Sequence, residues 1–231
     1  MHPALALLIV ALVVIAAAWL VHWLLIRTEG VFLGRRVVVW LYDLAAGRYD
    51  AIKQFDPDTE SAFVAWPLRR RLKEWPAPVV LDVATGTGRL PFFLLQEPDF
   101  NGRVIGLDAS SGMLDRARAK LAPFADRAAL VRQSASDLPF ADKTFAAVTC
   151  LEALEFLPDD AAALREMARV LRPGGVLLVS RRQGTDAAYF LGHTHDRDSF
   201  EAMLAGLGLT DIRSQPWQVE YELVWAARPR E

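Results

Sequence analysis

The first 26 residues carry almost no polar side chains. Residues 4–21 are all apolar, and the apolar character continues to Ile26. As a helix this stretch would be roughly 36 Å long, against roughly 30 Å for the hydrocarbon core of a bilayer. Trp19 and Trp23 lie toward one end, where amphipathic rings favour the membrane–water interface. We therefore predict a transmembrane anchor over residues 1–26.

Basic side chains predict the orientation of this anchor. Arg27, Arg35 and Arg36 follow the apolar run, and no lysine or arginine stands before it. Because Lys and Arg concentrate on the cytoplasmic side, we expect a single-pass membrane protein whose C-terminal domain is cytoplasmic. Two other interpretations remain open. One is a cleaved signal peptide, which normally begins with a basic segment, and the other is a buried core helix.

After residue 77 the chain alternates between short apolar runs, which predict strands, and segments with apolar residues at i, i+3 and i+4, which predict helices. The predicted strands are Val79–Val83, Arg103–Leu107, Leu130–Arg132, Phe145–Cys150, Val176–Ser180, Ile212–Gln215 and Val219–Ala226. The predicted helices are Arg89–Gln96, Ser111–Ala122, Asp159–Val170 and Ser199–Ala205, with Pro173-Gly174-Gly175 stopping the third.

This alternation favours an α/β fold, a doubly wound and mostly parallel sheet with helices on both faces. The last two strands have no helix between them, so we expect them to form a hairpin that adds one antiparallel strand. The predicted organisation is an anchor at 1–26, a connecting and lid region at 27–77, and a catalytic or binding domain at 78–231.

Charge and cysteine content narrow the choice of partners. With 26 Lys and Arg against 28 Asp and Glu, the net charge is −2, which is unlike that of a basic nucleic-acid binder. The one cysteine, Cys150, ends a predicted buried strand and is expected in the core. His193 and His195 stand two residues apart, and such a pair does not by itself form a metal site. We therefore predict no nucleic-acid partner and no metal.

The stretch Arg69-Arg70-Arg71-Leu72-Lys73 is basic. It fits the solvated face of a short helix, and contact with anionic lipid headgroups is the alternative.

A glycine-containing turn follows the first predicted strand of the domain. Val80–Gly88 passes from strand to turn to helix, at the carboxyl end of a parallel strand, where ligands bind in such sheets. Gly86 and Gly88 allow close backbone approach to a ligand. A dinucleotide loop would have a third glycine where Pro91 stands, and Asp82 within the strand would crowd a pyrophosphate. A nicotinamide or flavin dinucleotide is therefore the weaker alternative.

An acidic residue ends the next strand. Asp108 stands 20 residues after Gly88, the spacing at which a carboxylate reaches the ribose hydroxyls of an adenosine. Asp108 could instead cap the following helix, but Ser110 or Ser111 can fill that position. We favour ribose binding.

With these residues the chain resembles the class I S-adenosylmethionine-dependent methyltransferases, over about residues 79–180 and more weakly to the end. Val80–Gly88 resembles the first motif of that family, with Ala84 where many members have glycine. The ubiquinone/menaquinone-biosynthesis methyltransferases commonly carry alanine there. Residues 108–114 and 169–175 resemble two further motifs of the family.

The resemblance implies a Rossmann-like sheet of seven strands, the seventh antiparallel, and S-adenosylmethionine as the cofactor. Asp108 would then bind the ribose and Met113 would pack on the adenine, while Ser134 or Asp137 would contact the adenine amino group. Leu151 would face the methionine part, beside Glu152. The implied cofactor-binding residues are Asp82, Ala84, Thr85, Gly86, Thr87, Gly88, Asp108, Ala109, Met113, Ser134, Ala135 and Leu151.

Two aromatic residues before the first strand, Tyr42 and Tyr49, resemble lid residues of relatives, and packing under an N-terminal cover is the alternative. No catalytic residue is assigned. Glu152, Glu155, His193 and His195 stand near strand ends and are the candidates for a general base.

A membrane anchor favours an apolar substrate, because tethering raises the effective concentration of anything dissolved in the bilayer. We expect a membrane-lipid acceptor, either a quinone precursor or a phospholipid headgroup. A soluble small molecule or a protein as acceptor, and a non-catalytic cofactor-binding module, are the alternatives.

Overall fold

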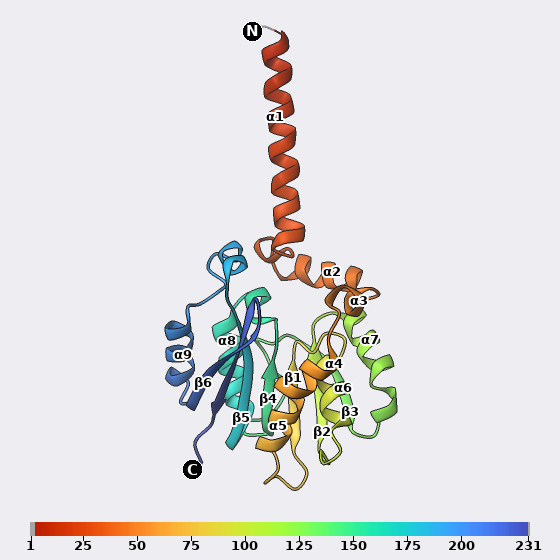
Figure 1. Cartoon of the computed structure of the whole chain (residues 1–231), viewed down its shortest axis with the longest axis vertical. Coiled ribbons are helices and arrows are strands. Elements are labelled where there is room, and N and C mark those ends of the chain that lie inside the picture. Colours follow the sequence, from red (N-terminus) through yellow and green to blue (C-terminus); the bar gives the residue numbers. More distant parts are fainter. Residues whose placement is uncertain (1–2, 231) are drawn as a thin grey trace.

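The computed structural model describes residues 3–230, and its centre is a seven-stranded sheet with the order β3-β2-β1-β4-β5-β7-β6 (Figure 1). The strands β1 to β5 run parallel, whereas β7 is antiparallel to both β5 and β6. The predicted doubly wound sheet with one antiparallel strand is therefore confirmed. The strands are β1 (Val79–Val83), β2 (Arg103–Asp108), β3 (Ala128–Arg132), β4 (Phe145–Cys150), β5 (Leu171–Arg182), β6 (Thr210–Gln218) and β7 (Tyr221–Ala227).

Helices precede the sheet and cover both of its faces. They are α1 (Pro3–His22), α2 (Arg35–Ala45), α3 (Tyr49–Lys53), α4 (Pro57–Glu60), α5 (Trp66–Arg71), α6 (Arg89–Gln96), α7 (Ser111–Lys120), α8 (Asp160–Val170) and α9 (Arg197–Gly206). Helix α7 ends two residues before its predicted end, and a short 3-10 turn, Ala122–Phe124, follows it.

Apolar side chains fill the space on both sides of the sheet. On one side Leu164 of α8 and Phe200 of α9 pack against Leu81 and Val148 of the central strands. On the other side the buried residues of α5 and α6 pack against the same strands, together with Leu121 at the end of α7. Cys150 belongs to the first cluster, as its position in the sequence predicted.

Strand β5 begins earlier than predicted. Helix α8 ends at Val170, and Leu171 already pairs with Phe145 of β4; regular pairing then resumes at Val176. Residues 172–175, expected as a plain turn, form an irregular part of the strand. Both the amide of Gly174 and the carbonyl of Gly175 are hydrogen-bonded to the Arg228 backbone, which holds the segment against the end of β7.

Helix α1 rises away from the domain as a separate rod (Figure 1). With the π-helical turn Trp23–Arg27 it forms 25 continuous helical residues, long and apolar enough to cross a membrane, and its apolar stretch is not buried by the rest of the chain. Such a helix near the N-terminus also fits a signal sequence.

The basic stretch on α5 lies at the end of the domain remote from α1 (Figure 1). Arg69 pairs with Asp99, at 2.5 Å, and Arg71 stacks over the ring of Trp225. These contacts and this position do not favour binding of lipid headgroups by α5.

Candidate active site

The glycine loop, residues 84–88, follows β1, and a buried carboxylate accepts a hydrogen bond from it. Asp82 accepts hydrogen bonds of 2.6 Å from the hydroxyls of Thr85 and of Thr149 on β4. Burial raises the pKa of Asp82 to about 6, against the effect of these hydrogen bonds. The carboxylate therefore fixes the shape of the loop.

The loop uses left-handed backbone conformations at Ala84 (φ 54°) and Gly86 (φ 54°). For alanine this conformation costs about 1 kcal/mol, which explains why glycine is common at this position in the family. The close fit of the loop on β2 depends on Gly106, since a Cβ there would lie 2.9 Å from the side chain of Thr85.

Asp108 at the end of β2 connects the loop to the next helix. Its Oδ2 accepts a hydrogen bond from the Gly86 amide and its Oδ1 accepts one from the Ser110 amide, both at 2.8 Å. Burial raises the pKa of this carboxylate, and the amide hydrogen bonds oppose the rise. Ser110 is the N-cap of α7 and accepts from the amide of Met113, so Asp108 is not the cap. Asp108 is thus free to use its remaining lone pairs toward a ligand.

Helix α2 lies over this end of the sheet and is fixed there by a second carboxylate. Asp43 accepts hydrogen bonds from the Ser110 hydroxyl, at 2.6 Å, and from the Gly112 amide, at 2.8 Å. A Cβ at Gly112 would lie 3.1 Å from the Asp43 carbonyl oxygen, so glycine permits this approach of α2 to α7.

A third carboxylate fixes α3. Asp50 accepts a hydrogen bond of 2.6 Å from the Thr87 hydroxyl, and it pairs with Lys120 of α7 at 2.7 Å. The two short helices before the domain therefore form a roof over the glycine loop.

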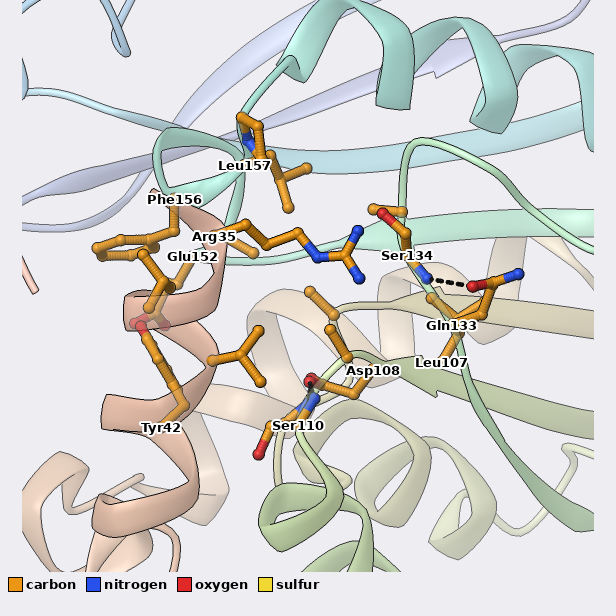
Figure 2. Close-up of a pocket in the computed structure, with 18 of the residues that line it drawn as sticks. Arg35, Tyr42, Leu107, Asp108, Ser110, Gln133, Ser134, Glu152, Phe156 and Leu157 are labelled. Atoms are coloured by element: carbon orange, nitrogen blue, oxygen red, sulfur yellow. Dashed lines mark hydrogen bonds between the residues drawn. The ribbon is translucent and has the colours of Figure 1, made fainter. Parts of the chain in front are cut away.

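Between this roof and the carboxyl ends of β1, β2 and β4 lies a cavity that opens to solvent; together with the part continuous with solvent it encloses about 770 Å³. Figure 2 shows Arg35 reaching from α2 into the cavity toward Ser134, with Asp108 below it. Seven of the residues predicted to bind a cofactor line the cavity, namely Ala84, Gly86, Asp108, Ala109, Ser134, Ala135 and Leu151.

The other five predicted residues are not part of the lining. Asp82, Thr85 and Thr87 make the supporting hydrogen bonds described above. Gly88 is the residue before α6, and Met113 is fully buried in α7. Their direct contact with a cofactor stays a prediction. Of the two residues proposed for the adenine amino group, Ser134 lines the cavity and Asp137 does not.

Glu152, which follows β4 and lines the cavity, is held as an anion. It accepts hydrogen bonds from Arg89 at 2.7 Å and from Lys53 at 2.9 Å, and Gln218 lies within 3.1 Å. Burial alone would raise the pKa of Glu152, but the charges of Arg89 and Lys53 outweigh it and lower the pKa to about 2. A carboxylate this acidic is a poor proton acceptor at neutral pH.

The other candidate bases lie outside the cavity. Glu155 is buried against Tyr221 and Arg182, and burial raises its pKa. His195 is 2.6 Å from Asp160, and His193 packs edge-on against Phe32. Among the residues that the structure describes, none of these three lines the cavity.

The sequence did not indicate the remaining lining residues, which come from the roof, from the carboxyl ends of β2 and β3 and from the loop after β4. These are Arg35, Val38, Val39, Leu107, Ser110, Gln133, Ala153, Phe156, Leu157 and Pro158. Tyr42 and Tyr49 do line the cavity, as lid residues would, and Tyr42 also donates a hydrogen bond to Glu29 at 2.8 Å. Burial raises the pKa of both phenols, that of Tyr49 to about 12, so both stay protonated.

The fold and the site define a class of protein. Residues 80–175 match the family model described as a methyltransferase domain. The phosphoethanolamine N-methyltransferase 2 of Haemonchus contortus, solved with S-adenosyl-L-methionine, shares the fold, with a TM-score of 0.59 at 16% identity over 71% of this chain and 52% of that one. Residues 80–175 are thus a methyltransferase domain, with the fold of the class I S-adenosylmethionine-dependent methyltransferases that the sequence resemblance implied.

Within this class the chain is similar to enzymes of quinone biosynthesis. It is 37% identical to the demethylmenaquinone methyltransferase of Symbiobacterium thermophilum, over 58% of this chain and 55% of the relative. It is 35% identical to the ubiquinone/menaquinone biosynthesis C-methyltransferase UbiE of Roseobacter denitrificans, over 65% of this chain and 60% of the relative. The chain therefore spans somewhat more than half the length of these curated relatives.

We predict that Asp108→Ala weakens binding of S-adenosylmethionine by about 10- to 100-fold, because hydrogen bonds to a charged group contribute about 1.5–3 kcal/mol. Titration calorimetry on the full chain in detergent checks this. Asp115→Ala, which removes an exposed ion pair with Arg118 on α7, is the matched control. Equal affinity of wild type and Asp108→Ala would contradict the assignment.

We predict that Glu152 stabilises the fold above its unfolded-state pKa and that this stabilisation is lost as the pH falls toward 2. A folded-state pKa of about 2 against an ordinary value of 4.5 corresponds to about 3 kcal/mol at neutral pH and to roughly half of that at pH 3. The difference in unfolding free energy between wild type and Glu152→Gln should shrink accordingly. Denaturant unfolding at both pH values measures it.

For comparison, Glu74→Gln removes an exposed partner of Arg230, and such surface pairs contribute little. A wild-type advantage over Glu152→Gln that stays constant with pH would show that the Glu152 charge is not what stabilises the fold.

Proposed function

We propose that this protein methylates a small apolar acceptor, a quinone precursor, with S-adenosylmethionine as the methyl donor. The observation that supports the proposal is a cavity lined both by the Asp108 carboxylate, beside the glycine loop, and by apolar side chains of α2. The names of the quinone-biosynthesis relatives support the same acceptor class.

The residues present fit the cofactor. Asp108 offers a carboxylate for the ribose hydroxyls, and the backbone at Gly86 can approach closely because it carries no side chain. Ser134 and Ala135 would border the adenine, and Leu151 would lie by the methionine part. When bound there, S-adenosylmethionine would supply the methyl group of its sulfonium to the acceptor, with S-adenosylhomocysteine and a proton as the other products.

The protein's own contribution is positioning and exclusion of water. Val38, Val39 and Phe156 give the cavity apolar walls, which suit a ring or a prenyl chain. Glu152 and the two tyrosines are not suited to take a proton at neutral pH. The site therefore favours an acceptor that is already ionised or that carries a free lone pair.

Arg35 would supply the positive charge that stabilises an anionic acceptor. It is the cationic residue in the described lining, and the described residues offer it no hydrogen-bond or ion-pair partner. A guanidinium in this position would stabilise the phenolate of a hydroquinone and so increase electron density on the ring carbon that is methylated. This charge preference supports a phenolic acceptor over a cationic amine headgroup.

Helix α1 supports the choice of a lipid-dissolved acceptor. We infer that Pro3–Arg27 spans the membrane once, and that Arg27, Arg35 and Arg36 keep the domain on the cytoplasmic side. The absence of nucleic-acid and metal partners stays a prediction from composition.

We predict that the full chain, reconstituted in phosphatidylcholine vesicles with methyl-labelled S-adenosylmethionine, transfers label to a demethylated quinol. In vesicles that contain phosphatidylethanolamine in place of the quinol, the lipid should stay unlabelled. Asp108→Ala should lower methyl transfer to the quinol. Label in phosphatidylethanolamine alone would support the headgroup alternative. No label in either lipid, with cofactor binding intact, would leave a soluble acceptor or a binding module.

We predict that Arg35→Gln lowers the turnover of the quinol by about 10- to 100-fold, the loss expected for one charge-assisted hydrogen bond. The acidic limb of its pH–rate profile should move to higher pH, because the acceptor phenol loses the cation that lowers its pKa. Arg36→Gln, which leaves the cavity lining intact, should behave as wild type in the same vesicle assay. A variant with normal turnover and weaker cofactor binding would show that Arg35 serves the cofactor instead.

A further inference from the structure

Helix α2 has apolar side chains on two opposite sides. Val38, Val39 and Tyr42 face the cavity. Trp40 and Leu44, one turn apart, are 58% and 72% exposed, although both are large and apolar. An exposed apolar pair on a helix that is otherwise docked marks an interaction surface when further apolar residues adjoin it.

Two segments at the same end of the domain as α2 carry further exposed apolar residues. Leu33, exposed, stands two residues before α2. Leu191 is 70% exposed and lies in the loop between β5 and α9. We call Leu33, Trp40, Leu44 and Leu191 the α2 patch. Figure 1 shows α2 and that loop at the end of the domain from which α1 rises.

The junction between α1 and this end of the domain is closely packed. Trp23, at the end of the apolar helix, stacks on Phe32 with ring centroids 5.1 Å apart. The Gly30 amide donates to the Leu24 carbonyl, and the Thr28 hydroxyl donates to the same oxygen at 3.1 Å. Arg27 lies over the ring of Tyr189, 4.8 Å from its centroid. The position of α2 relative to α1 is therefore set by contacts over a few residues.

We propose that the α2 patch rests on the lipid bilayer that α1 crosses, so that α2 lies at the headgroup level and separates the cavity from the membrane. The connection to α1 favours the lipid bilayer as the partner of this patch. Only seven residues separate the end of the membrane-spanning helix from α2, so the patch stays close to the membrane surface. Tryptophan and leucine on one face of a helix are the side chains that enter the headgroup–acyl boundary. The inference rests on the membrane-spanning role proposed for α1.

Single-cysteine labelling of the full chain tests this contact. Cys150 is fully buried, so an environment-sensitive fluorophore should attach only at an introduced Leu44→Cys, or at Trp40→Cys in a second variant. Trp66→Cys is the matched control, because Trp66 is a 43% exposed apolar residue on α5 at the opposite end of the domain. The vesicles are phosphatidylcholine with some phosphatidylglycerol, and a nitroxide-bearing lipid is the quencher.

We expect a blue-shifted emission at position 44, and at position 40, with quenching by the nitroxide lipid about threefold or more above that at position 66. A label at Ile15→Cys, within α1, reports separately on the anchor. Quenching at 15 without quenching at 44 and 40 would overturn the bilayer contact and leave the anchor intact. A blue shift at 44 without lipid quenching would indicate a protein on the patch, such as a second copy, and would also overturn it.

Discussion

The hydrogen bonds accepted by Asp108 hold the site together. One carboxylate joins the glycine loop after β1, through Gly86, to the first turn of α7, through Ser110. Ser110 extends this connection to α2, because its hydroxyl donates a hydrogen bond to Asp43. The floor of the cavity, the following helix and the roof are therefore linked by consecutive hydrogen bonds. A hydrogen bond to a charged group contributes about 1.5–3 kcal/mol, and together these bonds set where a ligand meets α2.

A second set of buried charges fixes the region before the domain to the sheet. Arg89 of α6 pairs with Glu152 after β4 and lies 3.6 Å from Glu60 of α4, while Lys53 of α3 reaches Glu152 from the roof. A buried ion pair adds little stability relative to apolar residues of the same shape, but removal of one partner leaves an unpaired buried charge. The geometric consequence here is that α3 and α6 converge on the Glu152 carboxylate, while α4 is attached through Arg89. The carboxylate is thereby kept ionised and unavailable as a base.

The part of the site that sequence predicts is the part built from local signals. A strand, a glycine turn and a helix follow one another in Val80–Gly88, and Asp108 ends the next strand at a fixed spacing, so both fall at the carboxyl ends of adjacent parallel strands. Side-chain burial within these motifs is less predictable. Asp82 and Met113 belong to the motif segments, yet both side chains are packed inside.

The roof could not be predicted in the same way, because its contacts join residues far apart in the chain. Asp43 meets Ser110 across 67 positions and Lys53 meets Glu152 across 99. The sequence predicted only a connecting and lid region over residues 27–77, and α2 within it has apolar residues on two sides. Only the fold shows that Arg35 and Tyr42 line the cavity while Trp40 and Leu44 face away from it. The early start of β5 was missed for a similar reason, since it depends on pairing with Phe145 and on Arg228.

The two apolar sides of α2 fit the position proposed for it between the cavity and a membrane. An 11-residue helix is too short to be stable alone in water, so it depends on burial. The inner side obtains that burial from the domain, through Val38 and the Asp43 hydrogen bonds, and the outer side would obtain it from lipid. In the proposed reaction Arg35 would then supply what lipid lacks, a cation for the oxygen of the acceptor ring.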